Sequence, residues 1–433
     1  MGREWIDHAI WWQIYPLGFT GVDIRGDRDG AVGDLRALIG WLDYAAELGV
    51  SGLLLGPIFT SATHGYDTID HFHVDPRLGG DAAFDELVGA CRDRGLHIIL
   101  DGVFNHVSDQ SELFARAQTD PDARGWFVEQ DPAREGRSGG PAFRTFEGHT
   151  DLIALNHQNP AVIGHVSTVM MHWLGRGADG WRLDAAYLVP DHFWRSVLEP
   201  VRREFPDAYV FGEVIHGDYA AFVEASGVDS VTQYELWKAT WSSLNDQNLF
   251  ELSWAISRHD EFTRAFVPQT FVGNHDVTRL ASVLTDDRDV AIAYALLFCL
   301  AGLPSVYYGD EQRFRGEKTE RLGGDDAVRP AFPSSPDELA PYGWDTYREL
   351  QQLIGFRRRH PWLHRATTET VDVTNTTMRL ISRSDDTEIT LYLNVGDDPH
   401  GCGVAAAEVT LASDDVPRDD DLVLPPHSWA IIG

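Results

Sequence analysis

Cysteine and basic residues are both scarce in this chain of 433 residues. The three cysteines, Cys91, Cys299 and Cys402, lie far apart, so we expect neither a disulfide framework nor a CxxC site. The 35 lysines and arginines stand against 67 acidic residues, which gives a formal net charge of -32 at pH 7. Such an acidic surface repels nucleic-acid phosphate and anionic lipid, which argues against both as partners and favours a neutral ligand.

Long apolar runs are also missing. No stretch of about 18 uninterrupted apolar residues occurs, and residues 1–7 show no basic region followed by an apolar run. We therefore expect no membrane span and no secretory leader, and we expect a cytoplasmic protein. Hydrophobic residues nevertheless make up 43% of the chain, enough for a large barrel or doubly wound domain with an accessory module.

Short apolar runs alternate with longer helical patterns over most of the chain, which predicts strand-helix units around a parallel sheet. Eight such strands predict a (β/α)8 TIM barrel, in which catalytic groups lie at the C-terminal ends of the strands. The expected strands are residues 9–17, 53–56, 96–103, 180–185, 208–214, 230–236, 270–274 and 304–309. The expected helices are residues 34–48, 82–94, 161–174, 191–205, 249–263 and 290–300.

Two regions depart from this alternation. Residues 107–155 have no sustained period, which predicts a functional loop or a small inserted domain after the third strand. From residue 366 onward the pattern alternates, which predicts an antiparallel β-sandwich. The expected parts are therefore barrel in 1–106, insertion in 107–155, barrel again in 156–364 and sandwich in 365–433. The basic run Arg357–Arg359 is interpreted as the solvated end of a helix.

The stretch 179–185, Asp-Gly-Trp-Arg-Leu-Asp-Ala, predicts a short buried strand with polar residues at its end. Arg182 and Asp184 are two apart, so they share one face of that strand. A guanidinium beside a carboxylate lowers its pKa and keeps it ionised, as a nucleophile requires. For this motif alone, a structural ion pair is an equally good interpretation.

Three further polar clusters end predicted strands, namely 101–106 (Asp-Gly-Val-Phe-Asn-His), 212–214 (Gly-Glu-Val) and 273–276 (Gly-Asn-His-Asp). Four carboxylates, two histidines and an arginine at one barrel mouth are hard to explain by packing. A pair of carboxyls, one ionised and one protonated, is the requirement of glycosidic bond cleavage.

The four clusters resemble, in order, the DxVxNH, GxRxD, GEx and NHD motifs of the α-amylase family of glycoside hydrolases. Other stretches that resemble family segments are Gln-Ile-Tyr-Pro at 13–16, His-Gly-Tyr-Asp at 64–67, Val-Asp-Pro at 74–76, residues 303–311 and residues 424–429. The resemblance thus covers nearly the whole chain. It implies that the insertion is the family's domain B, unusually short here, and we expect it and residues 314–341 to reach the barrel mouth.

The resemblance also implies roles. Asp184 would be the nucleophile, Glu213 the general acid and then base, and Asp276 a stabiliser of the transition state. Configuration would then be retained, with the Asp184 and Glu213 carboxyls about 5 to 5.5 Å apart. The substrate-binding residues that it implies are Tyr66, His64, Asp67, His106, Arg182, His216, His275 and Arg279. For any of these histidines alone, a buried structural role would be the better interpretation.

Some positions depart from the family pattern. Calcium-dependent relatives place a domain B aspartate near the asparagine of DxVxNH, but Ala154 stands at that place here. We therefore expect no metal and no cofactor, and a structural role for Asn105. The acidic loop 23–34, with Asp27, Asp29 and Gly30, only faintly resembles a cation loop, and an acidic turn is favoured.

Thr63 stands where exo-acting isomaltase-like relatives place an aspartate, and Ala185 follows the nucleophile as in α-1,4-specific members. The segment 213–216 resembles the group that degrades cyclomaltodextrins. These positions predict hydrolysis of short linear or cyclic α-1,4-glucans, neutral oligosaccharides. A transglucosylase and an exo-acting α-glucosidase stay open as alternatives, as does a homo-oligomer, while a non-catalytic scaffold is disfavoured because Asp184, Glu213 and Asp276 are all present.

Overall fold

The computed structural model describes residues 5–24, 33–130, 143–321, 323–417 and 420–433. Its central sheet has eight parallel strands in the order β11-β10-β9-β5-β2-β1-β13-β12. A parallel bridge between Thr232 and Gln269 joins the two edges, so the sheet closes as the predicted (β/α)8 barrel. The barrel strands are β1 Trp11–Ile14, β2 Gly52–Leu55, β5 His97–Gly102, β9 Gly180–Leu183, β10 Tyr209–Gly212, β11 Ser230–Val231, β12 Gln269–Phe271 and β13 Leu303–Tyr307.

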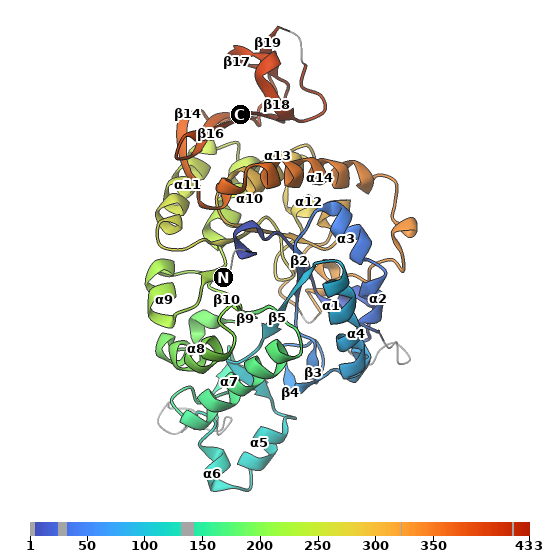
Figure 1. The fold of residues 1–433 in the computed structure, drawn as a ribbon, viewed down its shortest axis with the longest axis vertical. Coiled ribbons are helices and arrows are strands. Elements are labelled where there is room, and N and C mark those ends of the chain that lie inside the picture. Colours follow the sequence, from blue (N-terminus) through green and yellow to red (C-terminus); the bar gives the residue numbers. More distant parts are fainter. Residues whose placement is uncertain (1–4, 25–32, 131–142, 322, 418–419) are drawn as a thin grey trace.

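Helices surround the barrel, as Figure 1 shows. Their apolar faces carry buried side chains such as Leu87 of α4 and Val197 of α8. The helices are α1 Pro16–Phe19, α2 Arg36–Ile39, α3 Leu42–Leu48, α4 Gly80–Asp93, α7 Pro160–Gly175, α8 Asp191–Glu204, α9 Tyr219–Ser226, α10 Tyr234–Asn245, α11 Leu249–Thr263, α12 Leu280–Val283, α13 Asp289–Cys299 and α14 Gly343–Arg359. Cys91 and Cys299 are buried in α4 and α13, and all three cysteines are free.

Three expected elements differ from the structure. The strand expected at 9–17 ends at Ile14, and α1 begins at Pro16. The single helix expected at 34–48 is two helices, α2 and α3, because the chain bends at Gly40 and Trp41. The strand expected at 230–236 ends at Val231, and α10 begins at Tyr234. The side chain of Gln233 accepts a hydrogen bond from the Leu236 N–H and so caps the new helix.

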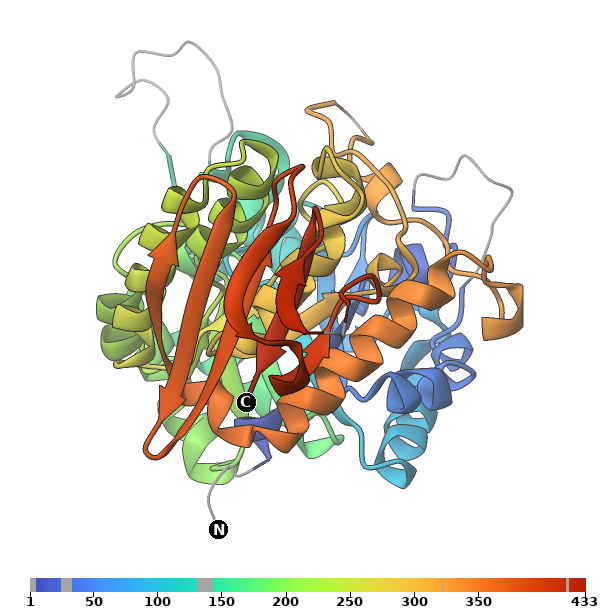
Figure 2. The same ribbon diagram turned by 90° about the horizontal axis from the view of Figure 1, so that it is seen from above.

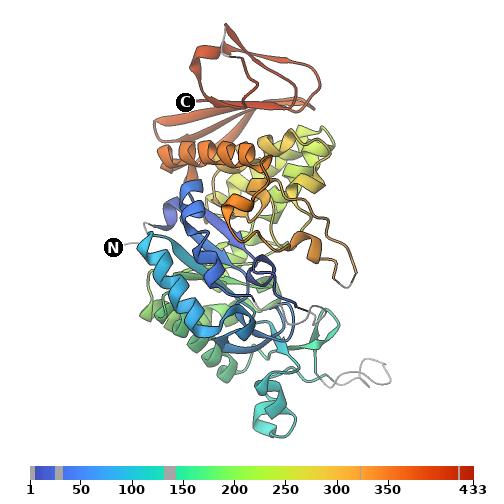
Figure 3. The same ribbon diagram turned by 90° about the vertical axis from the view of Figure 1, so that its right-hand side faces the viewer.

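The insertion after β5 contains short elements rather than a featureless loop. Its three-stranded sheet, in the order β6-β8-β7, consists of β6 His106–Ser108, β8 His149–Ala154 and β7 Thr145–Phe146. Helices α5 Glu112–Ala117 and α6 Pro121–Arg124 are capped by Ser111 and Asp120. A hairpin of β3 Phe59–Ser61 and β4 Thr68–Val74 lies beside β6. In Figure 3, α5 and α6 lie at the opposite end of the molecule from the C-terminal strands.

The C-terminal region has antiparallel sheets, as predicted. Five strands, β14 Thr367–Val373, β15 Thr377–Ser384, β16 Thr387–Asn394, β20 Ser428–Ile432 and β18 Val409–Ala412, form one sheet in the order β14-β15-β16-β20-β18. Strands β17 His400–Ala405 and β19 Asp421–Leu424 form a second. One face of the larger sheet packs on the barrel helices through residues such as Trp429, and the other encloses a small core with Leu422 and Leu424. Figure 2 looks down on this sheet where it covers α14.

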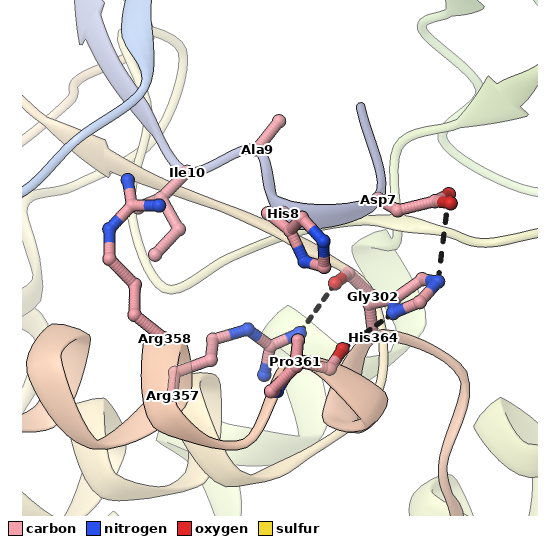
Figure 4. Close-up of a pocket in the computed structure, with 9 residues that line it drawn as sticks. All are labelled: Asp7, His8, Ala9, Ile10, Gly302, Arg357, Arg358, Pro361 and His364. Atoms are coloured by element: carbon pink, nitrogen blue, oxygen red, sulfur yellow. Dashed lines mark hydrogen bonds and ion pairs between the residues drawn. The ribbon is translucent and has the colours of Figure 1, made fainter. Parts of the chain in front are cut away.

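The basic run at the end of α14 agrees only in part with its interpretation as a solvated helix end, because Arg358 and Arg359 are exposed and Arg357 is not. Arg357 is buried, and its guanidinium donates to the carbonyls of Phe298, Leu300 and Gly302 at 2.6–2.8 Å. Figure 4 shows this arginine beside a small cavity. The cavity lies at the N-terminal ends of β1 and β13, because Ile10 and Gly302 line it. It is therefore at the end of the barrel opposite the predicted catalytic residues.

Candidate active site

The predicted catalytic residues converge at the C-terminal ends of neighbouring barrel strands. Strands β5 and β9 pair in parallel with Asp101 opposite Arg182. Asp184 directly follows β9, and Glu213 directly follows β10. Asp276 lies in the turn after β12. All strands of a parallel barrel have their C-terminal ends at the same end of the barrel. The four sequence clusters therefore lie close together there.

Arg182 is the centre of this group. Its Nη1 atom lies 2.6 and 2.7 Å from the two carboxylate oxygens of Asp101 and 3.3 Å from Oδ1 of Asp184. Its Nη2 atom lies 3.0 Å from Oε1 of Glu213 and 3.8 Å from Oδ2 of Asp276. The arginine side chain is only 4% exposed. One buried guanidinium thus holds four carboxylates around it, which fixes their relative positions.

The ionisation of Asp184 differs from the expectation. Burial and the neighbouring Glu213 carboxylate raise the pKa of Asp184 well above its ordinary value, and Arg182 does not reverse this. The reason is geometric, because the guanidinium binds Asp101 more closely than Asp184 and its charge is shared. Loss of the Asp184 proton is therefore opposed by burial and by the negative charge beside it.

Glu213 is held at both carboxylate oxygens. Its Oε2 accepts a hydrogen bond of 3.0 Å from the Ala185 N–H, and its Oε1 accepts one of 3.2 Å from the Tyr234 hydroxyl. Ala185 has φ of +44°, a left-handed conformation that is rare for a residue with a side chain. This strained backbone turns the N–H toward Glu213, and it directly follows Asp184, so the geometry of the two acids is linked.

Asp276 has nitrogen partners on both sides. Its Oδ2 lies 2.9 Å from Nε2 of His275, and its Oδ1 accepts a hydrogen bond of 2.8 Å from Arg329. Burial alone would raise the pKa of Asp276, but His275, Arg329 and Arg182 outweigh it and the pKa is lowered. The carboxylate is thus kept ionised, and its side chain is 28% exposed at the barrel mouth.

Tyr66 joins this group from the β3–β4 hairpin. Its hydroxyl donates to Asp101 Oδ2 at 3.1 Å and contacts His275 Nε2. The Tyr66 and His275 rings are parallel, with centroids 5.5 Å apart. His106 donates from Nε2 to the Tyr66 carbonyl at 2.9 Å. Burial lowers the pKa of His106 to about 4, so this imidazole is neutral and holds the hairpin in place.

His64 and Asp67 support the same hairpin from within. His64 Nδ1 accepts a hydrogen bond of 3.3 Å from the Tyr66 N–H. Asp67 is buried and accepts hydrogen bonds from the Thr63 hydroxyl at 2.5 Å and the Gly65 N–H at 3.2 Å. These contacts position Tyr66, and they also explain why Thr63 does not face the barrel mouth as a free polar group.

Two predicted substrate-binding residues lie apart from the group. Arg279 is fully buried, donates to Asp310 at 2.7 Å and to the carbonyls of Tyr308 and Val328, and so holds the loop after β13. Contact with substrate was predicted for Arg279, and this buried arrangement does not agree with that prediction. His216 is exposed, with its ring 5.4 Å from that of Tyr187.

Arg329 and Tyr234 are site residues that the sequence patterns did not indicate. Arg329 comes from the irregular loop between β13 and α14, which has no periodic pattern that would indicate a role for a single residue. Residues 314–341 as a whole were expected to reach the barrel mouth. Tyr234 stands where a strand is predicted, and its position follows from the early start of α10. The polar run Thr232-Gln233-Tyr234 directly after the end of β11 is the signal that could have found Tyr234.

In the described part of the chain, no three His, Cys, Asp or Glu side chains are grouped to hold a metal ion. Ala154 of β8 pairs with His106 of β6 at the place of the family's domain B ligand. Asp27, Asp29 and Gly30 of the acidic loop lie outside the described residues. Among the helices that are described, none is long and apolar enough to cross a membrane.

The family described as "Alpha amylase, catalytic domain" matches residues 13–382. This chain belongs to the α-amylase family of glycoside hydrolases. A cyclomaltodextrinase of Geobacillus thermopakistaniensis is 29% identical over 84% of the chain, and one of a Bacillus species is 28% identical over 92%. The intracellular maltogenic amylase of Bacillus subtilis is 29% identical over 72% of the chain. The chain spans only 64%, 74% and 57% of the length of these three α-amylase family members.

Solved structures of the α-amylase family match over the full length. The ligand-free cyclic α-maltosyl-(1→6)-maltose hydrolase of Arthrobacter globiformis has a TM-score of 0.83 and 28% identity, covering 100% of this chain and 99% of the other. The debranching enzyme of Nostoc punctiforme, soaked with acarbose, has a TM-score of 0.82 and 25% identity, with 100% and 99% covered. The barrel with its insertion and C-terminal sheets is thus an α-amylase fold.

Proposed function

We propose that this protein hydrolyses α-1,4-glucosidic bonds in short linear or cyclic maltooligosaccharides with retention of configuration. The observation that carries the proposal is the group of carboxylates around Arg182. Asp184 and Glu213 follow neighbouring strands, and Asp276 contacts the same guanidinium from the turn after β12. The relatives named cyclomaltodextrinase and maltogenic amylase support the substrate class. The name of the Bacillus subtilis relative also supports a cytoplasmic location.

The chemistry proceeds in two displacements. A carboxylate oxygen of Asp184 bonds to the anomeric carbon while the glycosidic C–O bond breaks, and Glu213 gives its proton to the departing oxygen. Water then attacks the same carbon, Glu213 takes a proton from it, and the ester bond to Asp184 breaks. The reaction begins from the form in which Asp184 is ionised and Glu213 holds the proton.

The remaining residues bind and stabilise. Asp276, kept ionised by His275 and Arg329, lies where it can accept hydrogen bonds from sugar hydroxyls as positive charge develops. The ring of Tyr66 stacks on the sugar at the cleavage site. Contacts with Asp101 and His275 hold this ring in position. The spacing of 5 to 5.5 Å between the two catalytic carboxyls stays a prediction.

A second candidate substrate is cyclic α-maltosyl-(1→6)-maltose. The Arthrobacter enzyme named for this compound matches 100% of the present chain with a TM-score of 0.83 and 28% identity. A cyclic tetrasaccharide also fits a neutral, uncharged ligand class. This candidate differs from the first because its ring also contains α-1,6 bonds, so one panel of substrates separates the two.

The test is a panel of maltotriose, β-cyclodextrin, cyclic α-maltosyl-(1→6)-maltose, isomaltose and trehalose, with Asp184→Asn protein as the blank. We expect kcat/KM for maltotriose or a cyclic substrate to exceed that for isomaltose by about tenfold or more. A ratio at or below one contradicts the α-1,4 assignment. Proton NMR of the first product separates mechanisms, because retention releases the α-anomer and an initial β-anomer contradicts it. Longer products from maltotriose would indicate the transglucosylase alternative.

A further inference from the structure

Tyr234 connects two of the catalytic motifs. It lies in the first turn of α10, and its hydroxyl donates to Oε1 of Glu213 at 3.2 Å. Nδ2 of Asn274 donates to the same hydroxyl at 3.0 Å, and Oδ1 of Asn274 accepts the Asp276 N–H at 2.9 Å. A continuous chain of hydrogen bonds therefore runs from the backbone of Asp276 to the carboxyl of Glu213.

The direction of this chain follows from its ends. The Asp276 N–H can only donate, so the Asn274 atom that faces it is the amide oxygen and the amide nitrogen faces Tyr234. That nitrogen can only donate, so it occupies an acceptor position on the phenol oxygen. The phenol proton is left for Glu213. Burial raises the pKa of Tyr234 well above its ordinary value, so the hydroxyl keeps this proton.

The hydroxyl is held at a fixed place. The Tyr234 ring packs edge to face against Phe271 of β12, with centroids 4.9 Å apart, and against Trp237, with centroids 5.7 Å apart. Just before it, the Thr232 hydroxyl accepts from the Val214 N–H at 2.9 Å and donates to the Val214 carbonyl at 3.1 Å. The segment from β11 to α10 thus holds both the backbone beyond Glu213 and its side chain.

We propose that Tyr234 is a positioning residue for the general acid, fixing the orientation of the Glu213 carboxyl and stabilising the carboxylate left after proton transfer. With the Ala185 N–H on Oε2 and the phenol on Oε1, rotation of the carboxyl breaks two hydrogen bonds. The inference rests on the proposed role of Glu213. Unlike that role, it assigns no contact between Tyr234 and the reacting atoms.

The test compares Tyr234→Phe with wild type on two substrates, maltotriose and α-maltosyl fluoride. Fluoride leaves without a proton, so kcat/KM for the fluoride does not depend on the general acid, whereas that for maltotriose does. We expect kcat/KM for maltotriose to fall about 10- to 100-fold and that for the fluoride to stay within about threefold. KM for maltotriose should stay within about twofold of wild type, because substrate contacts remain.

The pH profile gives a second readout. Removing a donor from an ionised carboxylate raises its pKa, so the basic limb of kcat/KM on maltotriose should move up by about one pH unit. The other charged or titratable groups that face Glu213 are Arg182, Asp184, Asp101, Asp276 and Tyr187, and all are unchanged in the variant. Tyr219→Phe is the matched control, because its buried hydroxyl donates at 3.0 Å to the Ile215 carbonyl instead of a carboxylate.

Equal losses on the two substrates, an unmoved basic limb, or a rise in KM alone would each overturn the proposal and leave Tyr234 a structural or substrate-binding residue. An effect of Tyr219→Phe equal to that of Tyr234→Phe would also overturn it. Failure of the proposed function gives a different result. In that case wild type cleaves the fluoride but does not cleave α-1,4-glucans. The substrate that it does cleave then replaces maltotriose in the same comparison.

Discussion

At the scale of single residues, the charge state of each catalytic carboxyl depends on charged neighbours from several strands, whereas a sequence motif shows only the neighbours within one strand. Arg182 contacts four carboxylates, so its effect on Asp184 is smaller than the two-residue spacing suggests. The motifs predict a nucleophile and an acid, but the sign of the Asp184 pKa shift depends on burial and on Glu213 from another strand. Such sums of contacts from separate elements cannot be read from one segment.

Asp184→Asn and Glu213→Gln test the two catalytic roles directly. Each change removes an ionisable group and keeps the shape of the side chain, so we expect kcat on the best substrate to fall about 1,000-fold or more. Circular dichroism and the melting temperature should show a folded protein. A variant that retains more than about a tenth of wild-type kcat would contradict its assigned role.

Arg329→Gln tests how Asp276 is kept ionised. The pKa of Asp276 is held below its ordinary value, so its contribution to activity is present at neutral pH and is lost as pH falls through that pKa. Removing the Arg329 charge raises the pKa, so we expect the acid limb of kcat/KM to move to higher pH. Arg315→Gln is the control, because this exposed arginine of the same loop pairs with Asp287. An unmoved acid limb would contradict the role of Arg329.

At the scale of secondary structure, periodicity predicted the strand-helix order, while element ends depended on local capping. The strand expected at 230–236 is the clearest example, since Gln233 starts α10 and thereby brings Tyr234 to the active site. Likewise, Arg357 belongs to a basic run typical of a solvated helix end, yet its guanidinium donates to three carbonyls in and after the last turn of α13. Tertiary contacts decided both cases, and no pattern along the sequence shows them.

The contact between α14 and β20 predicts a pH effect on stability. Burial raises the pKa of Glu349 to about 7, although Trp429 Nε1 donates to it at 3.3 Å. An acid whose pKa is raised on folding costs nothing below its unfolded value near 4.5, and stability falls as pH rises from there to about 7. Glu349→Gln keeps the acceptor oxygen and removes the charge. We expect it to raise the melting temperature at pH 8 by a few degrees and to change it little at pH 4.5.

Asp345→Asn is the matched control, because this residue of the same helix is exposed. It should leave the melting temperature nearly unchanged at both pH values. A Glu349→Gln protein that is less stable than wild type at pH 8 would show that the ionised carboxylate is favourable at this contact.

At the scale of the whole molecule, periodicity predicted the barrel and the C-terminal sheets, and a break in periodicity predicted the insertion. The family motifs then fixed the order of the catalytic strands. Metal dependence also concerns the whole molecule. Because Ala154 stands in place of an acidic ligand, we predict that activity and stability do not depend on a metal ion. Incubation with EDTA should leave both activity and melting temperature unchanged. A fall of many degrees that calcium restores would contradict this expectation and direct attention to the loop 23–34.

The net charge of -32 predicts that salt stabilises the fold. Like charges repel more strongly in the compact state than in the unfolded chain, and screening weakens that repulsion. The Debye length falls from about 10 Å at 0.1 M salt to about 3 Å at 1 M, which is shorter than most distances between surface carboxylates. We expect the melting temperature at pH 7.5 to rise by a few degrees between these concentrations of NaCl, and by less at pH 5, where some carboxylates are protonated. A melting temperature that falls with salt would show that the surface ion pairs, such as Arg36 with Glu86, outweigh the net repulsion.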